Sequence, residues 1–358
     1  MIVFNKPGVL KYGFKHLIAT PWQAPSLWCG SSPSLWVNVV ISGSARALKY
    51  RSSPGQDFYR RNYRRYTLVK STPQKKAVAS RYQDRSVAFL TQHGKEALLG
   101  KAFATTLRCK LVRAAGFDTD QLGTFSREIE RPDTQLRTAR TKARIGMDIL
   151  GLPVGIASEG AFSLDPYTGL MPWNIEMLVW QDDELAHEIV GVAQGPARSV
   201  QATARTIEDV LRLVEQAGFP EHQLTMRPNN ERDRRVRKGI ATMEALQQTF
   251  AECISESTQG SVFVESDLRA FCNPTRQAMI SRAAEDLMRK ITSHCPNCGT
   301  PGYAVTEHRP GLPCAVCHTP TKLALASIWR CGKCSYSHEE KADKEHFADP
   351  SRCDYCNP

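Results

Sequence analysis

The chain has 358 residues, of which 41% are hydrophobic, so it is long enough to bury a sizeable core and to carry a smaller appended region. No apolar run reaches 18 residues, which argues against a transmembrane span and against a membrane partner. The net charge of +11 comes from the first 80 residues, which hold 13 basic residues and a single acid. Because the remainder is almost neutral, its charge does not favour binding to a phosphate backbone.

Residues 1–80 are expected to form a separate basic region. Residues 21–55 are rich in Pro, Ser and Gly, and residues 59–66 interleave tyrosine with arginine. Such a segment is able to stack on single-stranded nucleic acid, and it is the only place where we expect a nucleic-acid partner. The segment shows no hydrophobic periodicity, so we predict a disordered N-terminal extension. In one interpretation this extension lies upstream of the true start of the protein.

Residues 81–291 show the alternation of apolar strands and amphipathic helices that is typical of an α/β domain with a mixed sheet. The pattern predicts strands at 86–91, 110–114, 154–157, 176–180, 188–193, around 224 and at 261–265, and helices at 95–107, 136–150, 207–214, 240–250 and 274–291. Asn273 followed by Pro274 is typical of the start of the last helix.

Polar residues that follow the strands are the candidates for a binding site, because ligands of open α/β sheets gather at the carboxyl ends of strands. The predicted catalytic carboxylates are Glu96, Glu159, Glu265 and Asp267. The predicted substrate-binding residues are His93, Lys95, Lys142, Arg269 and Arg276. Together they suit a magnesium-assisted phosphate site, whereas each one taken alone also suits an ordinary turn or cap.

Four Cys-x-x-Cys pairs occupy residues 292–358, which we predict to be a tandem zinc-ribbon region. The expected metal ligands are Cys295, Cys298, Cys314, Cys317, Cys331, Cys334, Cys353 and Cys356. Fifteen residues separate the first two pairs and eighteen separate the last two, so the spacing predicts two consecutive ribbons, each built from neighbouring pairs. Sites with four cysteine ligands leave no open position, which indicates two structural zinc ions.

Disulfides and an iron–sulfur cluster are the alternatives to zinc. Disulfides require an oxidising compartment, and the N-terminus has no clear secretory signal, so we expect reduced thiols and a cytoplasmic location. Four thiolates also suit iron, and that alternative stays open.

Residues 82–358 resemble an uncharacterised bacterial family that is known only as a domain of unknown function. The motifs that carry the resemblance are Leu90-Thr91-x-His93-Gly94-Lys95-Glu96, Asp118-Thr119-Asp120-x-Leu122-Gly123-Thr124-Phe125, Ala157-Ser158-Glu159-Gly160-Ala161-Phe162, Glu265-Ser266-Asp267-Leu268-Arg269 with Asn273-Pro274-Thr275-Arg276, and the closing Cys353-Asp354-Tyr355-Cys356-Asn357-Pro358. The family implies no established activity.

A second resemblance concerns the α/β domain alone. A strand leading to Thr91-x-x-Gly94-Lys95-Glu96, a helix with Ala139-x-x-Lys142-Ala143 and a strand leading to Ser158-Glu159-Gly160 are similar in order to inosine-triphosphatase-type nucleoside-triphosphate pyrophosphatases. The resemblance implies that Lys95 binds phosphate, that Glu96 and Glu159 hold magnesium, and that Lys142 faces the triphosphate.

Three classes of function follow from these patterns. The first, slightly favoured, is a magnesium-dependent hydrolase that acts on a nucleotide or another phosphate-bearing small molecule. The second is a non-catalytic adaptor that binds protein or nucleic acid through its ribbons, and the third is a sensor that binds a ligand without turning it over.

Overall fold

A computed structural model describes residues 9–10, 17–18, 81–92, 94–130, 132–343 and 346–358. The chain divides into two compact units, Met1–Thr72 and Pro73–Pro358. In the first unit the described residues form one short antiparallel pair, β1 (Val9–Leu10) and β2 (Leu17–Ile18). The predictions for residues 21–55 and 59–66 therefore lie outside the described residues.

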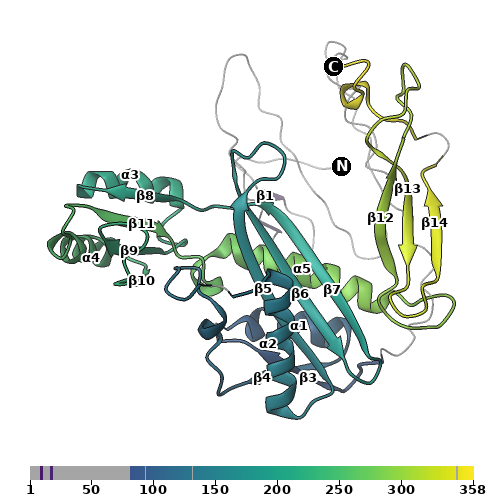
Figure 1. Cartoon of the computed structure of the whole chain (residues 1–358), viewed down its shortest axis with the longest axis horizontal. Coiled ribbons are helices and arrows are strands. Elements are labelled where there is room, and N and C mark those ends of the chain that lie inside the picture. The colour runs from purple at the N-terminus through teal and green to yellow at the C-terminus, as the bar shows by residue number, and fades with distance from the viewer. Residues whose placement is uncertain (1–8, 11–16, 19–80, 93, 131, 344–345) are drawn as a thin grey trace. The chain divides into compact units, whose positions relative to one another are not determined.

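Five strands of the second unit form a mixed sheet in the order β4-β3-β5-β6-β7 (Figure 1). Their bounds are β3 (Ser86–Leu90), β4 (Lys110–Ala114), β5 (Val154–Leu164), β6 (Pro172–Asp182) and β7 (His187–Pro196). β3 runs parallel to β4 and β5, whereas β5, β6 and β7 form an antiparallel meander. The predicted mixed-sheet α/β fold is thus confirmed.

Helices cover both faces of this sheet. They are α1 (Lys95–Thr106), α2 (Gln135–Leu150) and α5 (Pro274–Thr292). Phe89 of β3 shares a core with Phe103 of α1 and Ile280 of α5. The next residue, Leu90, points to the opposite face and packs against Gly146 of α2. A methyl group added to Gly146 would lie only 3.3 Å from the Leu90 Cβ.

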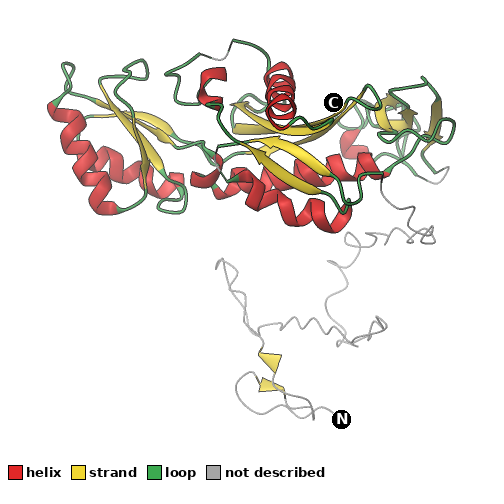
Figure 2. Ribbon diagram, turned by 90° about the horizontal axis from the view of Figure 1, so that it is seen from below, coloured by secondary structure: helices red, strands yellow, loops and turns green. Residues whose placement is uncertain are grey.

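A second sheet has four antiparallel strands in the order β10-β9-β11-β8. Its elements are β8 (Gln201–Ala204), α3 (Ile207–Ala217), β9 (Leu224–Pro228), β10 (Arg237–Ile240), α4 (Met243–Ser255) and β11 (Val262–Ser266). Both helices lie on one face, where Met226 and Val264 pack with Leu246 in a separate core (Figure 2). The alternate residues of the strands, including Thr225 and Glu265, project from the other face.

This second sheet was not predicted, since the apolar pattern of a strand does not specify which strand it pairs with. Ile240 was placed at the start of a helix but ends β10, and β8 was not predicted at all. β5 was expected to stop at Ala157 but continues to Leu164, because β6 supplies hydrogen-bonding partners along its whole length. Asn273 accepts a hydrogen bond from the Arg276 N–H at 3.0 Å, which confirms the predicted helix start.

The cysteine-rich end of the chain is an antiparallel meander of β12 (Ala304–Pro310), β13 (Ala324–Arg330) and β14 (Ser337–Lys341). It contacts the turn between β6 and β7: Lys333 Nζ donates to the Leu185 carbonyl at 2.8 Å, and His187 Nε2 lies 3.1 Å from the Pro301 carbonyl oxygen. Short 3-10 helices are found at η1 (Thr119–Leu122), η2 (Ala270–Cys272) and η3 (Pro350–Arg352).

Candidate functional site

A polar pocket opens at the carboxyl end of β3. This strand pairs with β5 only as far as Phe89 and Ile156, whereas β5 runs on to Leu164. Beyond Ile156, β5 therefore pairs with no described strand on that side, and side chains from both of its faces reach the gap. Ser158 points to the α1 face and Glu159 to the α2 face, and both line the pocket.

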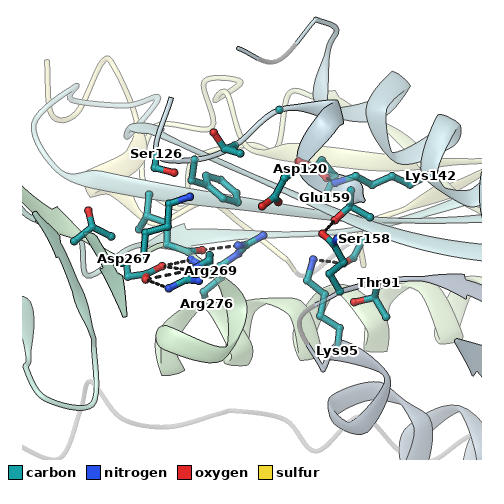
Figure 3. A pocket seen from close by; sticks show the side chains of 18 of the residues that line it. Thr91, Lys95, Asp120, Ser126, Lys142, Ser158, Glu159, Asp267, Arg269 and Arg276 are labelled. Carbon is teal, nitrogen blue, oxygen red and sulfur yellow. Dashed lines mark hydrogen bonds and ion pairs between the residues drawn. The ribbon is translucent and has the colours of Figure 1, made fainter. Parts of the chain in front are cut away.

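The lining comes from both sheets and from the loop that connects β4 to α2. The first sheet and its helices supply Thr91, Lys95, Lys142, Ser158, Glu159 and Arg276. The second sheet and the residues after β11 supply Thr225, Lys238, Glu265, Asp267 and Arg269, and the loop supplies Phe125. Figure 3 shows Lys95 and Ser158 at one end of the pocket, and Asp267 and Arg269 at the other.

Lys95 is the first residue of α1, and its amine donates to Ser158 Oγ at 2.9 Å. Among the described residues, no carboxylate lies within ion-pair distance of this amine. Burial in the pocket and, next, the Arg276 guanidinium lower the pKa of Lys95 from 10.5 to about 8. Glu176 and Glu159 act in the opposite direction without contacting the amine.

The other two cations at this end of the pocket are paired with acids. Lys142 of α2 contacts Glu159 at 2.6 Å, and both side chains are largely buried. Arg276 of α5 contacts Glu176 of β6 at 2.8 Å, and its guanidinium lies 4.4 Å from the centre of the Phe125 ring. Each pair joins two elements of the pocket wall, α2 to β5 and α5 to β6.

Arg269, at the far end of the pocket, is also paired with an acid. Asp267 accepts hydrogen bonds from Arg269 Nε at 3.0 Å and from the Gly239 N–H at 3.1 Å, and it also forms an ion pair with the end of the Arg269 guanidinium. That guanidinium lies 4.7 Å from the centre of the Phe271 ring. Arg269 is therefore held by an acid on one edge and by an aromatic face beneath it.

Glu265 joins the connecting loop to the second sheet. It contacts Arg127 of the loop at 2.6 Å and also the buried Arg227 of β9, which donates to the Ser126 carbonyl at 2.9 Å. Burial raises the pKa of Glu265, although the two arginines oppose that rise. A further ion pair joins Glu128 of the loop to Lys238, so the loop is anchored at several points along the pocket.

Seven of the nine predicted cleft residues line this one pocket, although they come from distant parts of the sequence. They are Lys95, Lys142, Glu159, Glu265, Asp267, Arg269 and Arg276. Glu96 does not line it: its carboxylate lies 3.8 Å from Arg113, on the other side of the first turn of α1. His93 lies outside the described residues.

The buried hydroxyls of Thr91 and Thr225 were not predicted as part of the pocket. These residues are 5% and 3% exposed, and their hydroxyls have no hydrogen-bond partner among the described residues. Ser158 was expected just after a strand that ends at Ala157, whereas it lies within β5. A buried threonine in a strand looks like any other β-branched residue in the sequence, so only its missing partner identifies it.

The predicted magnesium site has no support in this arrangement. In the described part of the chain, the two groups of three or more potential metal ligands consist of cysteines alone. Glu159, Glu265 and Asp267 each contact a basic side chain, so their charges are already balanced. A role for magnesium stays a prediction.

Eight cysteines form two clusters that are suited to hold zinc. Four ligands at the usual Zn–S distance, arranged as a tetrahedron, have sulfurs about 3.8 Å apart. The Sγ–Sγ distances are 3.7 Å for Cys295–Cys334 and for Cys298–Cys331, 3.8 Å for Cys314–Cys356 and 3.6 Å for Cys317–Cys353. These distances exceed a disulfide bond, and all four sulfurs of each cluster lie within 4.8 Å of one another, which fits a single ion.

The pairs combine differently from the prediction based on loop length. One cluster joins Cys295 and Cys298 to Cys331 and Cys334, and the other joins Cys314 and Cys317 to Cys353 and Cys356. The two four-cysteine clusters of the predicted double zinc ribbon are thus present, but the expected pairing of neighbours is wrong. The antiparallel meander explains the change, because the start of β12 lies beside the end of β13, whereas the end of β12 lies beside the start of β13.

No helix in the described part of the chain is long and apolar enough to span a membrane. The architecture is that of an α/β protein with a double zinc ribbon, whose pocket lies between two sheets. Residues 142–358 match a domain of unknown function, DUF6671; the match spans more than half of the chain, which therefore belongs to that family. No curated protein and no solved structure matches the chain.

Membership of an uncharacterised family is thereby confirmed. The matched region contains Ser158, the far end of the pocket and all the cluster cysteines, whereas Thr91 and Lys95 precede it. The resemblance to inosine-triphosphatase-type pyrophosphatases gains no support from these comparisons and stays a prediction.

Proposed function

We propose that the α/β part of the chain binds a phosphate-bearing small molecule in this pocket. The observation that carries the proposal is the Lys95 amine, which contacts the Ser158 hydroxyl but no carboxylate of the described residues. The other basic side chains of the pocket are already paired with acids. A partly buried ammonium without an opposite charge is unfavourable, and an anionic ligand supplies that charge.

Two features beside Lys95 support an anion at this end. The N-cap of α1 is Gly94, which has no side chain to cap the helix, so backbone N–H groups of the first turn are available to a ligand. The Thr91 hydroxyl is buried and lacks a partner among the described residues, and it lines the same pocket. An amine, a hydroxyl and a helix N-terminus together suit the oxygens of a phosphate group.

Isothermal titration of the full chain with inorganic phosphate, pyrophosphate and nucleoside triphosphates tests this proposal. We expect binding to at least one of these probes, and a loss of tenfold or more in affinity for Lys95→Met. Lys101→Met is the matched control, because Lys101 is an exposed lysine on the same helix. Absence of binding to every probe, or equal affinity in Lys95→Met, would refute the proposal.

Hydrolysis is a separate question from binding. Release of phosphate from the same nucleotides, with and without magnesium, measures it directly. Turnover that depends on magnesium and falls in Glu159→Gln would support the enzyme, whereas binding without turnover would support a sensor.

We further propose that each cysteine cluster holds one structural zinc ion in a reduced, cytoplasmic protein. Four thiolates fill a tetrahedral ion and leave no position for a reacting water. Backbone N–H groups point at the sulfurs, as from Val316 to Cys314 at 3.5 Å and from Lys333 to Cys331 at 3.3 Å. Metal analysis of the purified chain should find two zinc ions, and a chelator should unfold β12 to β14.

The ribbon surface gives little reason to prefer a nucleic-acid adaptor. Arg309 contacts Glu339, and Arg330 contacts Glu307, so basic side chains of the meander are balanced by acids on neighbouring strands. A phosphate backbone would have to displace these pairs.

A further inference from the structure

We propose that the ligand is a phosphorylated sugar or polyol, whose phosphate lies at the Lys95 end of the pocket and whose hydroxyls lie at the Arg269 end. This inference rests on the proposed binding of a phosphate-bearing molecule. It is carried by a difference between the two ends. Each has a buried hydroxyl with no hydrogen-bond partner among the described residues, but only the Lys95 end has a basic side chain that contacts no carboxylate of those residues.

At the Lys95 end one amine is not paired with an acid of the described residues. This amine contacts Ser158 and no carboxylate of the described residues, while the neighbouring Lys142 and Arg276 are paired with Glu159 and Glu176. An anionic group of a ligand supplies the opposite charge that this amine does not contact among the described residues.

At the Arg269 end four basic side chains each contact a carboxylate. Arg269 contacts Asp267, Lys238 contacts Glu128, and Arg127 and Arg227 share Glu265, so a second phosphate would have to compete with carboxylates already in place. An uncharged polar group meets no such competition.

At the far end the group without a described hydrogen-bond partner is an uncharged hydroxyl, that of Thr225. Thr225 of β9 is 3% exposed and lines the pocket, and its Oγ1 has no partner among the described residues. A hydroxyl both donates and accepts, so a ligand hydroxyl satisfies Thr225 whichever way its proton points. The Arg269 guanidinium, held by Asp267 and Phe271, offers its remaining N–H groups to the oxygens of a polyol.

Both ends line the same pocket, so one ligand is able to contact both. Figure 3 shows Lys95 and Thr91 on one side of this pocket and Arg269 and Asp267 on the other. The ends also belong to different sheets, so the ligand would join the first sheet to the second.

The test compares the affinities of the full chain for inorganic phosphate, glycerol 3-phosphate, glucose 6-phosphate and fructose 1,6-bisphosphate. We expect at least one of the two monophosphates to bind about tenfold more tightly than inorganic phosphate and more tightly than the bisphosphate, which is the gain of about one further hydrogen bond. A bisphosphate that binds most tightly, or monophosphates that bind no better than inorganic phosphate, would overturn the inference.

Three isosteric variants locate the effect. Thr225→Val should remove the preference for the monophosphate while leaving the affinity for inorganic phosphate unchanged, and Thr91→Val should weaken the binding of all four probes. Thr138→Val is the matched control, because its hydroxyl is also buried and unpartnered among the described residues but does not line the pocket. Since none of the three hydroxyls bonds to another described residue, each valine should leave the fold intact, which thermal unfolding verifies.

The outcomes separate the two proposals. If inorganic phosphate binds through Lys95 but Thr225→Val leaves the preference for the monophosphate unchanged, the sugar phosphate assignment fails and the phosphate site stands. If no probe binds, both fail.

Discussion

Arg276 and Glu176 form an ion pair in which both side chains are almost completely buried, 3% and 0% exposed, and the pair joins the first turn of α5 to the middle of β6. The pair lies against Gly160 of β5, where a side chain would have no room. A methyl group built on Gly160 would lie 2.7 Å from Arg276 Nη2 and still closer to the Glu176 carboxylate. The wall of the pocket thus depends on a glycine facing an ion pair.

Gly160→Ala should therefore destabilise the fold by about 2–4 kcal/mol, because the methyl group must push apart two buried charges or move the strand. Gly100→Ala in α1 is the control: nothing lies within 4 Å of its added methyl group, and alanine should stabilise the helix by up to about 1 kcal/mol. Urea denaturation of the two variants measures both changes. Equal stabilities for Gly160→Ala and the wild type would show that the ion pair is not packed as described.

The same ion pair predicts strong coupling between its partners. Arg276→Met and Glu176→Gln should each cost about 3–5 kcal/mol, since either change leaves a buried charge without its partner. The double variant should cost clearly less than the sum of the single changes. Additive effects in a double-mutant cycle would mean that the two charges do not depend on each other.

Lys95 predicts a dependence of stability on pH. Its pKa is about 8 in the folded chain and 10.5 in the reference state, so folding disfavours its ammonium form. The cost is fully present below pH 8 and disappears as the pH rises from about 8 through 10.5, because the unfolded chain then binds more protons than the folded one. The free energy of unfolding of Lys95→Met should therefore exceed that of the wild type at pH 7 by about 1–3 kcal/mol, so the variant should unfold at a higher denaturant concentration.

The advantage of Lys95→Met should shrink between pH 8 and pH 10, which denaturation at several pH values will show. Lys101→Met provides the baseline, since this exposed lysine should have little effect at any of them. A Lys95→Met chain that is less stable than the wild type at pH 7 would contradict the assignment of Lys95 as a partly buried cation without an acidic partner among the described residues. Phosphate at saturating concentration should stabilise the wild type and not the variant.

The interleaved cysteine clusters make a prediction that consecutive ribbons would reverse. In the described arrangement Cys295 and Cys331 belong to one cluster, so Cys295→Ser combined with Cys331→Ser should leave one zinc ion per chain. Cys295→Ser combined with Cys314→Ser damages both clusters and should strongly weaken the binding of both ions. Native mass spectrometry counts the ions in each variant. If the first variant loses both ions and the second keeps one, the pairs combine in sequence order instead.

The sequence alone determined which chemical groups this protein contains and, in outline, which segments are helices and strands. Cys-x-x-Cys spacing is local, because a tight turn brings two sulfurs together, and so the eight cysteines that form the two clusters were predicted from spacing alone. Asn273 and Pro274 likewise marked the start of α5 through a hydrogen bond that spans only three residues. Such features depend on neighbours in the chain.

The tertiary structure decided how these parts combine. The pairing of β12 with β13 chose which cysteines share a cluster, and a separate sheet for β8 to β11 brought Asp267 and Arg269 to face Lys95 across one pocket. The unpartnered hydroxyls of Thr91 and Thr225 could not be predicted, since a missing hydrogen bond depends on everything packed around it. Strand pairing and burial depend on residues far apart in the sequence, and here they bring predicted residues from distant segments together in one pocket.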